Sequence, residues 1–116
     1  GQAFPRKALI NGFDEQFLGA LSMGSCATIG TTVNLFAPLF HKVQEAVQRG
    51  DMAQAYHWQH AINLRVEATV KIGIFNAMKY GWTLKGVDCG FCRAPFRPLD
   101  EAARKAMADL IALPLE

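Results

Sequence analysis

Apolar and polar positions follow two different spacings along the chain. Short apolar runs over residues 7–11 and 26–31 predict two buried β-strands. Between them, apolar positions near a 3.6-residue period predict a helix over 13–23, and Gly24 suits the position just after its C-terminus. This strand–helix–strand order predicts two parallel strands, because parallel neighbours need a crossover connection.

Helical spacing then continues towards the C-terminus. Asn34 and Asp51 are the predicted N-caps of the first two helices, and Pro38 falls early enough in the first helix to be tolerated. Glycines and prolines between residues 85 and 99 predict a loop. Gly50 ends the first helix, Gly73 interrupts the pattern after the second, and Asp100 or a near neighbour starts the last. The predicted helices cover residues 35–49, 51–72, 74–84 and 100–113.

The predicted strands are confined to the N-terminal part of the chain, since one strand–helix–strand unit is followed by helices alone. An isolated pair of strands is only marginally stable. Both predicted strands are also apolar on both faces, which is typical of strands with neighbours on both sides. The sequence therefore predicts an incomplete fold, in which further strands come from outside this chain.

Composition narrows the function classes. The 116 residues are 51% hydrophobic and 19% charged, which suits one globular domain or part of a larger one. The net charge of +2 comes from basic and acidic residues spread along the chain, so nucleic-acid binding has little support. Three cysteines are too few for a disulfide scaffold, and we expect a reducing, cytoplasmic setting. No apolar run is long enough to predict a membrane span or a signal peptide.

Two adjacent carboxylates, Asp14 and Glu15, mark the first candidate site. They follow the turn Asn11-Gly12 at the end of the first predicted strand, where parallel α/β folds place ligand groups. At a helix start the dipole favours negative charge, so both side chains could serve the helix itself. Their oxygens could equally accept hydrogen bonds from a polyhydroxylated ligand, and the local pattern leaves both roles open.

Four short motifs together resemble one enzyme family. They are residues 11–15 (NGFDE), residues 29–34 (IGTTVN) after Gly24, Gly50-Asp51, and residues 91–96 (FCRAPF) followed by Pro98-Leu99. In this order and spacing they resemble the C-terminal part of the N-acetylneuraminate lyases, which are pyruvate-dependent aldolases related to dihydrodipicolinate synthase. The resemblance covers nearly the whole chain.

The resemblance implies an α/β fold that is the C-terminal part of a (β/α)8 barrel. Such a barrel needs about 250 residues. Residues 1–50 would hold barrel strands 7 and 8 with their helices, and residues 51–116 would form a C-terminal helical extension. The N-terminal part of the barrel, from missing residues or another chain, would be the partner that completes it. Family members are commonly tetramers, so a homo-oligomer is expected.

The activity that the resemblance implies is a class I aldolase reaction, the reversible cleavage of N-acetylneuraminate, a sialic acid, to N-acetylmannosamine and pyruvate. A lysine forms a Schiff base with pyruvate, a tyrosine relays the proton, and a Gly-Ser/Thr loop holds the carboxylate. In the family these groups precede the matched part. The lysines of this chain lie at a strand start, on predicted helices or in loops. We therefore expect no catalytic residue here and no activity from this chain alone. We also expect no metal and no cofactor.

By contrast, the resemblance does imply that residues of this chain bind the sugar part of the substrate. It implies that the carbonyl of Gly12 and the side chains of Asp14 and Glu15 bind substrate hydroxyls. Thr31 stands where the lyases usually have serine, and its hydroxyl keeps the same hydrogen-bonding capacity. Phe75 stands where the family places an aromatic near the sugar. The chain departs from the family at Val33, where many members have tyrosine.

Other interpretations stay open from the sequence. Cys89 and Cys92 form a Cys-x-x-Cys pair, which with His57 and His60 would provide four zinc ligands, or which could act alone in redox chemistry. Packing is the simpler role for both histidines. The chain could also be a non-catalytic assembly module, or part of a related aldolase with another 2-keto acid substrate.

Overall fold

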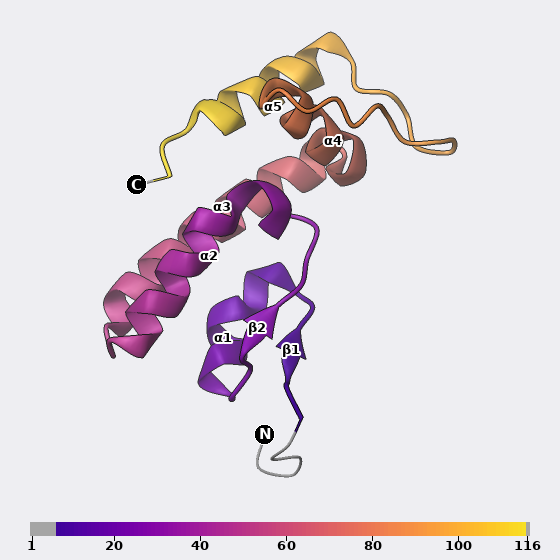
Figure 1. The fold of residues 1–116 in the computed structure, drawn as a ribbon. Helices are drawn as coiled ribbons and strands as arrows, with labels where there is room; N and C mark the ends of the chain where they lie inside the picture. Colours follow the sequence, from indigo (N-terminus) through magenta and orange to yellow (C-terminus); the bar gives the residue numbers. More distant parts are fainter. Residues whose placement is uncertain (1–6, 116) are drawn as a thin grey trace. The chain divides into compact units, whose positions relative to one another are not determined.

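The computed structural model describes residues 7–115, which divide into two compact units, residues 7–64 and residues 65–115. In the first unit, β1 (Ile10–Asn11) and β2 (Ala27–Thr28) pair in parallel, with Ile10 opposite Ala27 (Figure 1). The predicted parallel pair is confirmed, but both strands are shorter than predicted and are not buried. Within the described residues each strand has one neighbour, so nothing extends the ladder or covers Ile29, which is 70% exposed.

The connection between the strands starts as a tight helical turn. Residues predicted as one helix over 13–23 form a 3₁₀ helix, η1 (Asp14–Gln16), followed by α1 (Phe17–Ser22). Phe13 precedes η1 and provides no side-chain cap. Gly24 adopts a φ of 95° just after the helix, which confirms its predicted role, since this left-handed backbone favours glycine.

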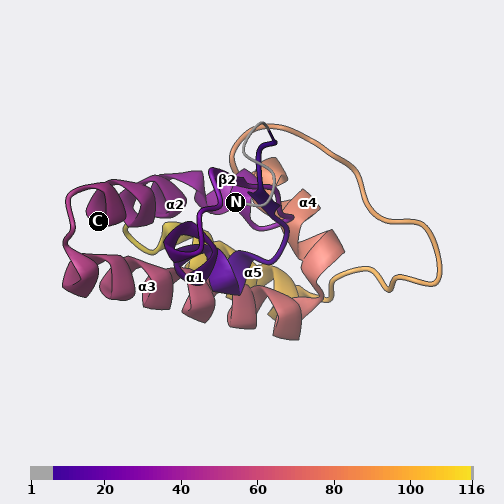
Figure 2. The ribbon, with the colours of Figure 1, turned by 90° about the horizontal axis from the view of Figure 1, so that it is seen from below.

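Two longer helices complete the first unit. The N-cap of α2 (Val33–Gln48) is Thr32, so the predicted cap at Asn34 is wrong. Phe36 has non-helical φ and ψ angles, because Pro38 lacks an N–H and interrupts the helical ladder near it. After Gly50 the chain turns into α3 (Met52–Ile72), and Figure 2 shows α2 and the first half of α3 running antiparallel. Asp51 caps α3 as predicted, accepting a hydrogen bond from the Gln54 N–H at 3.1 Å.

The core of the first unit forms where α1 and α2 face each other. Phe17 and Phe40 pack with ring centroids 5.5 Å apart, and each side chain is less than 5% exposed. Burial of side chains of this size contributes about 1.5–3 kcal/mol each, and the core therefore fixes the start of α1. The other buried apolar residues of this unit are Leu18, Leu35, Phe36, Leu39, Val43, Ala46, Ala55 and Ile62.

The second unit contains the end of α3, α4 (Ile74–Leu84) and α5 (Glu101–Ala112). Gly73, with a φ of 115°, separates α3 from α4 as predicted. The buried amide of Asn76 anchors the loop before α5. Its Nδ2 donates to the Arg97 carbonyl and its Oδ1 accepts from the Cys92 N–H, both at 2.8 Å. Val66, Ala77, Met78, Met107 and Leu110 form the apolar core.

A capping interaction starts α5. The Asp100 side chain accepts a hydrogen bond from the Ala103 N–H at 2.7 Å. Asp100→Ala is expected to lower the free energy of unfolding by about 1 kcal/mol, because that donor loses its partner. Urea unfolding followed by circular dichroism measures the change. Asp109→Ala, on the exposed face of the same helix, should cost less than about 0.5 kcal/mol. Equal losses in the two variants would contradict the capping role.

No helix among residues 7–115 is both long enough and apolar enough to cross a membrane.

Candidate functional site

The carboxyl ends of β1 and β2 are tied together by side chains. The Asn11 amide donates to the Phe13 carbonyl at 2.7 Å and to the Thr28 hydroxyl oxygen at 3.0 Å. The Thr28 hydroxyl in turn donates to the Asn11 carbonyl at 3.2 Å. These bonds fix the turn that leads from β1 into η1, so the residues that follow have a defined direction.

Asp14 links the two strand–helix junctions. Its side chain is only 6% exposed, and Oδ2 accepts hydrogen bonds from the Thr32 N–H at 3.0 Å and from the Thr32 hydroxyl. Thr32 is the N-cap of α2, so the carboxylate lies at the positive end of that helix dipole. Asp14 therefore stabilises the start of a helix other than its own, which neither of the two roles open from the sequence had included.

Gly30 leaves the space that the Asp14 carboxylate occupies. A Cβ at residue 30 would lie 1.7 Å from Oδ1 and 2.4 Å from Cγ of Asp14, far inside van der Waals contact. Oδ1 is itself buried and accepts no hydrogen bond from residues 7–115. The absence of a side chain at residue 30 is thus what allows Asp14 to reach Thr32.

Four of the predicted site residues lie in the first unit. Gly12 and Thr31 are exposed, Glu15 is half-buried, and Asp14 is buried. The Thr31 hydroxyl makes no hydrogen bond within the described residues, whereas its carbonyl accepts from the Asn34 amide at 3.0 Å. Phe75, the fifth, lies in the second unit at the start of α4, where its ring meets Phe96 edge-on at 5.3 Å.

Gln59 and Thr32 belong to this network of hydrogen bonds but were not predicted from the sequence. Gln59 is 7% exposed and hydrogen-bonds the Leu18 N–H and the Asp14 carbonyl. Its position in the sequence could have indicated this burial, because Gln59 lies between Ala55 and Ile62 on the apolar stripe of α3. A buried amide on such a stripe requires polar partners. Thr32 carried no comparable signal, because Thr31 beside it has the same side chain.

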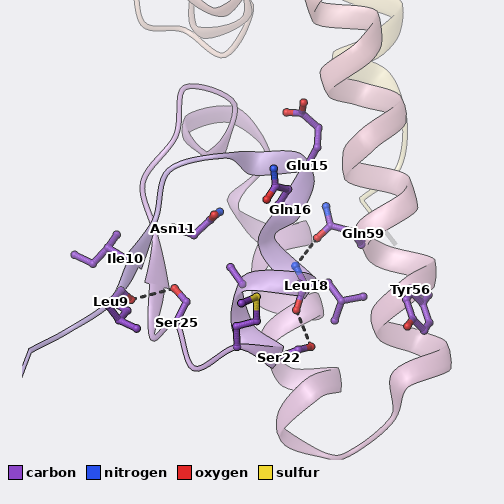
Figure 3. Close-up of a pocket in the computed structure, with 13 residues that line it drawn as sticks. Leu9, Ile10, Asn11, Glu15, Gln16, Leu18, Ser22, Ser25, Tyr56 and Gln59 are labelled. Atoms are coloured by element: carbon purple, nitrogen blue, oxygen red, sulfur yellow. Dashed lines mark hydrogen bonds between the residues drawn. The ribbon is translucent and has the colours of Figure 1, made fainter. Parts of the chain in front are cut away.

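A hollow of the first unit lies beside β1 and α1 rather than over the predicted sugar-binding residues. Its volume is about 660 Å³, and of those residues only Glu15 lines it. Figure 3 shows Glu15 and Gln16 at one end and Leu9 and Ser22 at the other. The apolar lining includes Leu9, Ile10, Met23 and Tyr56, which are all exposed. We call this surface the β1–α1 hollow.

The remaining ionisable groups form no metal site within residues 7–115, where no three His, Cys, Asp or Glu side chains are close enough to hold an ion. His57 packs edge-on against Trp58, and Lys42 lies 4.1 Å from the centre of the Trp58 ring.

In the second unit, burial lowers the pKa of Arg65. The pKa of Glu67 is lowered by its hydrogen bond to Lys71 and by the lysine charge, on an exposed helix face.

The family of the chain follows from its sequence. A profile of the Dihydrodipicolinate synthetase family matches residues 2–113. The chain belongs to this family. The match spans nearly every residue, including the β1–η1 turn, the Asp14–Thr32 link and α5.

Solved structures agree with this assignment. N-acetylneuraminate lyase from Fusobacterium nucleatum is 29% identical and superposes with a TM-score of 0.88 over 94% of this chain. A second structure of that enzyme, complexed with pyruvate, has a TM-score of 0.87. N-acetylneuraminate lyase from Mycoplasma synoviae is 27% identical, with a TM-score of 0.88 over 94% of this chain.

The chain spans about 38% of the length of these lyases. Its small parallel sheet and its helices are the C-terminal part of the (β/α)8 barrel fold of the family, as the resemblance implied. This also explains the exposure of Ile10 in β1, because a complete barrel gives every strand two neighbours. The division at residue 50 between barrel and extension stays a prediction.

Proposed function

We propose that this chain forms the sugar-binding part of a class I aldolase that cleaves N-acetylneuraminate to N-acetylmannosamine and pyruvate. The observation that carries the proposal is the likeness to N-acetylneuraminate lyases at up to 29% identity over 94% of the chain. The Schiff-base lysine lies in the N-terminal part of the barrel, so this chain alone is inactive. The completed enzyme is a cytoplasmic homo-oligomer, with a tetramer as the expected state.

The proposed sugar-binding residues are Gly12, Asp14, Glu15, Thr31 and Phe75. A polyhydroxylated substrate needs several oriented acceptors, and the half-buried Glu15 carboxylate and the exposed Thr31 hydroxyl are accessible in the first unit. Asp14 keeps Oδ2 on Thr32, so only Oδ1 is available to a substrate hydroxyl, and that contact requires the buried side chain to shift. Asp14 also fixes the backbone beside Thr31.

The proposed partner is the N-terminal part of the barrel. Among the described residues, β1 pairs only with β2, which leaves the other edge of β1 open beside the β1–α1 hollow. An open strand edge next to exposed Leu9, Ile10 and Met23 suits a further parallel strand and its helix. Docking of these elements would cover the apolar lining and extend the sheet.

Borohydride trapping tests the function directly. The enzyme completed by its N-terminal part is incubated with pyruvate and sodium borohydride, and intact masses are measured for every polypeptide. We expect a pyruvate-derived mass increment that maps outside residues 1–116, together with cleavage of N-acetylneuraminate. A label on a lysine of this chain would overturn the proposed division of roles. Pyruvate release from another 2-keto acid sugar, but not from N-acetylneuraminate, would overturn the substrate assignment.

Glu15→Gln tests the sugar-binding role of the more accessible carboxylate. Hydrogen bonds to charged groups contribute about 1.5–3 kcal/mol, so the KM for N-acetylneuraminate should rise about tenfold or more. Pyruvate trapping should be unchanged, because Glu15 is assigned to the opposite end of the substrate. The matched control is Glu45→Gln, an exposed carboxylate on α2. A KM within twofold of the parent value would exclude Glu15 from the sugar site.

A further inference from the structure

The Gln59 side chain interrupts the first turn of the helix that follows Asp14. Its Oε1 accepts a hydrogen bond from the Leu18 N–H at 2.8 Å, and its Nε2 donates to the Asp14 carbonyl at 3.2 Å. In a regular α-helix, the N–H of residue 18 would bond the carbonyl of residue 14 directly. The amide from α3 therefore takes the place of one backbone hydrogen bond, and Figure 3 shows it reaching α1.

The backbone around this insertion adopts the corresponding shape. The Phe17 N–H bonds the Asp14 carbonyl in 3₁₀ geometry, and regular α-helix begins only at Phe17. A side chain inserted into the helical ladder is an established cause of such a local change. The tighter turn comprises Asp14, Glu15 and Gln16, so the insertion acts on the backbone that carries both proposed sugar-binding carboxylates.

The orientation of the Gln59 amide is itself fixed. Nε2 also donates to Oδ1 of Asn63, one helical turn later, at 2.9 Å. Gln59 is buried, and its three hydrogen bonds occupy the carbonyl oxygen and both amide hydrogens. An apolar side chain of similar length would fill the same space, but it would leave the Leu18 N–H without an acceptor.

We infer that Gln59 is a positioning residue that holds Asp14 and Glu15 in the geometry needed for the polyhydroxylated end of the substrate. This inference rests on the proposed sugar-binding function. The hydrogen bonds of Gln59 to residues 14 and 18 go to backbone groups, so it acts through the direction of the η1 turn. Displacements of about 1 Å at such positions lower rates by up to about 100-fold in other enzymes.

The test compares Gln59→Met with Gln54→Met in the completed enzyme. Both changes replace glutamine on α3, but Gln54 is exposed. Sites that form the pyruvate Schiff base are counted by borohydride labelling, and kcat/KM for N-acetylneuraminate is expressed per labelled site. We expect Gln59→Met to lower this value about tenfold, mainly through KM, and Gln54→Met to leave it unchanged.

A purely structural role gives a different result. Gln59→Met would then reduce the number of labelled sites and the total activity together, so an unchanged kcat/KM per site overturns the inference. Asn63→Ala is the milder second variant, since it removes only the group that orients the amide at a half-buried position. Its per-site kcat/KM should fall about threefold by the same reasoning, and no change would also count against the inference.

Amide hydrogen exchange separates failure of this inference from failure of the proposed function. If the parent enzyme does not cleave N-acetylneuraminate, the proposed function is wrong. The hydrogen bond from the Leu18 N–H to Gln59 is then tested by itself. The exchange rate of this N–H should be at least tenfold higher in Gln59→Met than in Gln54→Met. Equal exchange rates in the two variants would show that Gln59 does not hold this turn.

Discussion

Gly30→Ala is expected to lower the free energy of unfolding by about 3 kcal/mol. The added Cβ would lie 1.7 Å from Asp14 Oδ1, so the carboxylate must leave its place beside residue 30. The added Cβ would also lie 2.7 Å from Asp14 Oδ2, so a displacement large enough to accommodate it would break the hydrogen bonds from Thr32 to this oxygen. Backbone strain plays no part, since the φ of Gly30 lies outside the left-handed region.

Urea unfolding provides the measurement, with the slope of the transition checked for equality between variants. Gly19→Ala is the matched control, because this glycine lies within α1 and a Cβ there meets nothing within 4 Å. The control should be stabilised by about 0.5–1 kcal/mol, as expected for alanine replacing glycine in a helix. If Gly30→Ala were as stable as the parent, the close approach of Asp14 to Gly30 would be wrong.

Asp14→Ala is expected to have the largest effect on activity. It removes the acceptor for the Thr32 N–H and for the Thr32 hydroxyl, and each buried donor left unpaired costs about 1–3 kcal/mol. We expect a loss of about 3 kcal/mol in the free energy of unfolding. In the completed enzyme, kcat/KM for N-acetylneuraminate should fall about 100-fold, because the backbone beside Thr31 loses its support.

The measurement is steady-state kinetics, with kcat/KM expressed per site that forms the pyruvate Schiff base. Unfolded protein forms no such site and therefore does not lower the measured value. Glu45→Ala, which removes an exposed carboxylate from α2, should leave both stability and kinetics within experimental error. Unchanged turnover of N-acetylneuraminate in Asp14→Ala would contradict the proposed specificity role. A loss of stability alone would leave Asp14 as a structural link between the two junctions.

In each of the two units, a buried side-chain amide hydrogen-bonds the backbone of another segment. Gln59 holds the start of α1 in the first unit, and Asn76 holds the loop before α5 in the second. Each one bonds a backbone N–H and a backbone carbonyl at the same time. A primary amide suits this task because it offers a donor and an acceptor without charge, whereas burial of a charge is costly.

The sequence by itself determined the local structure of the second half. Gly50 and Gly73 separate the helices where predicted, α4 covers the predicted 74–84, and Asp100 caps α5. The information for these features is local, since a capping side chain acts within three residues and a glycine acts on its own φ. The parallel pair of strands was also predicted, because a helix between two short apolar runs favours that order.

Only the tertiary structure decided the geometry of the candidate site. Asp14 bonds Thr32, 18 residues away, and Gln59 bonds the Asp14 carbonyl, 45 residues away. The predicted helix over 13–23 begins late because Gln59 interrupts its first turn, and α2 is capped at Thr32 rather than at Asn34. Such bonds depend on which segments the core brings together. A sequence pattern shows that a polar group on an apolar stripe needs a partner, but the packing of the helices determines which partner it meets.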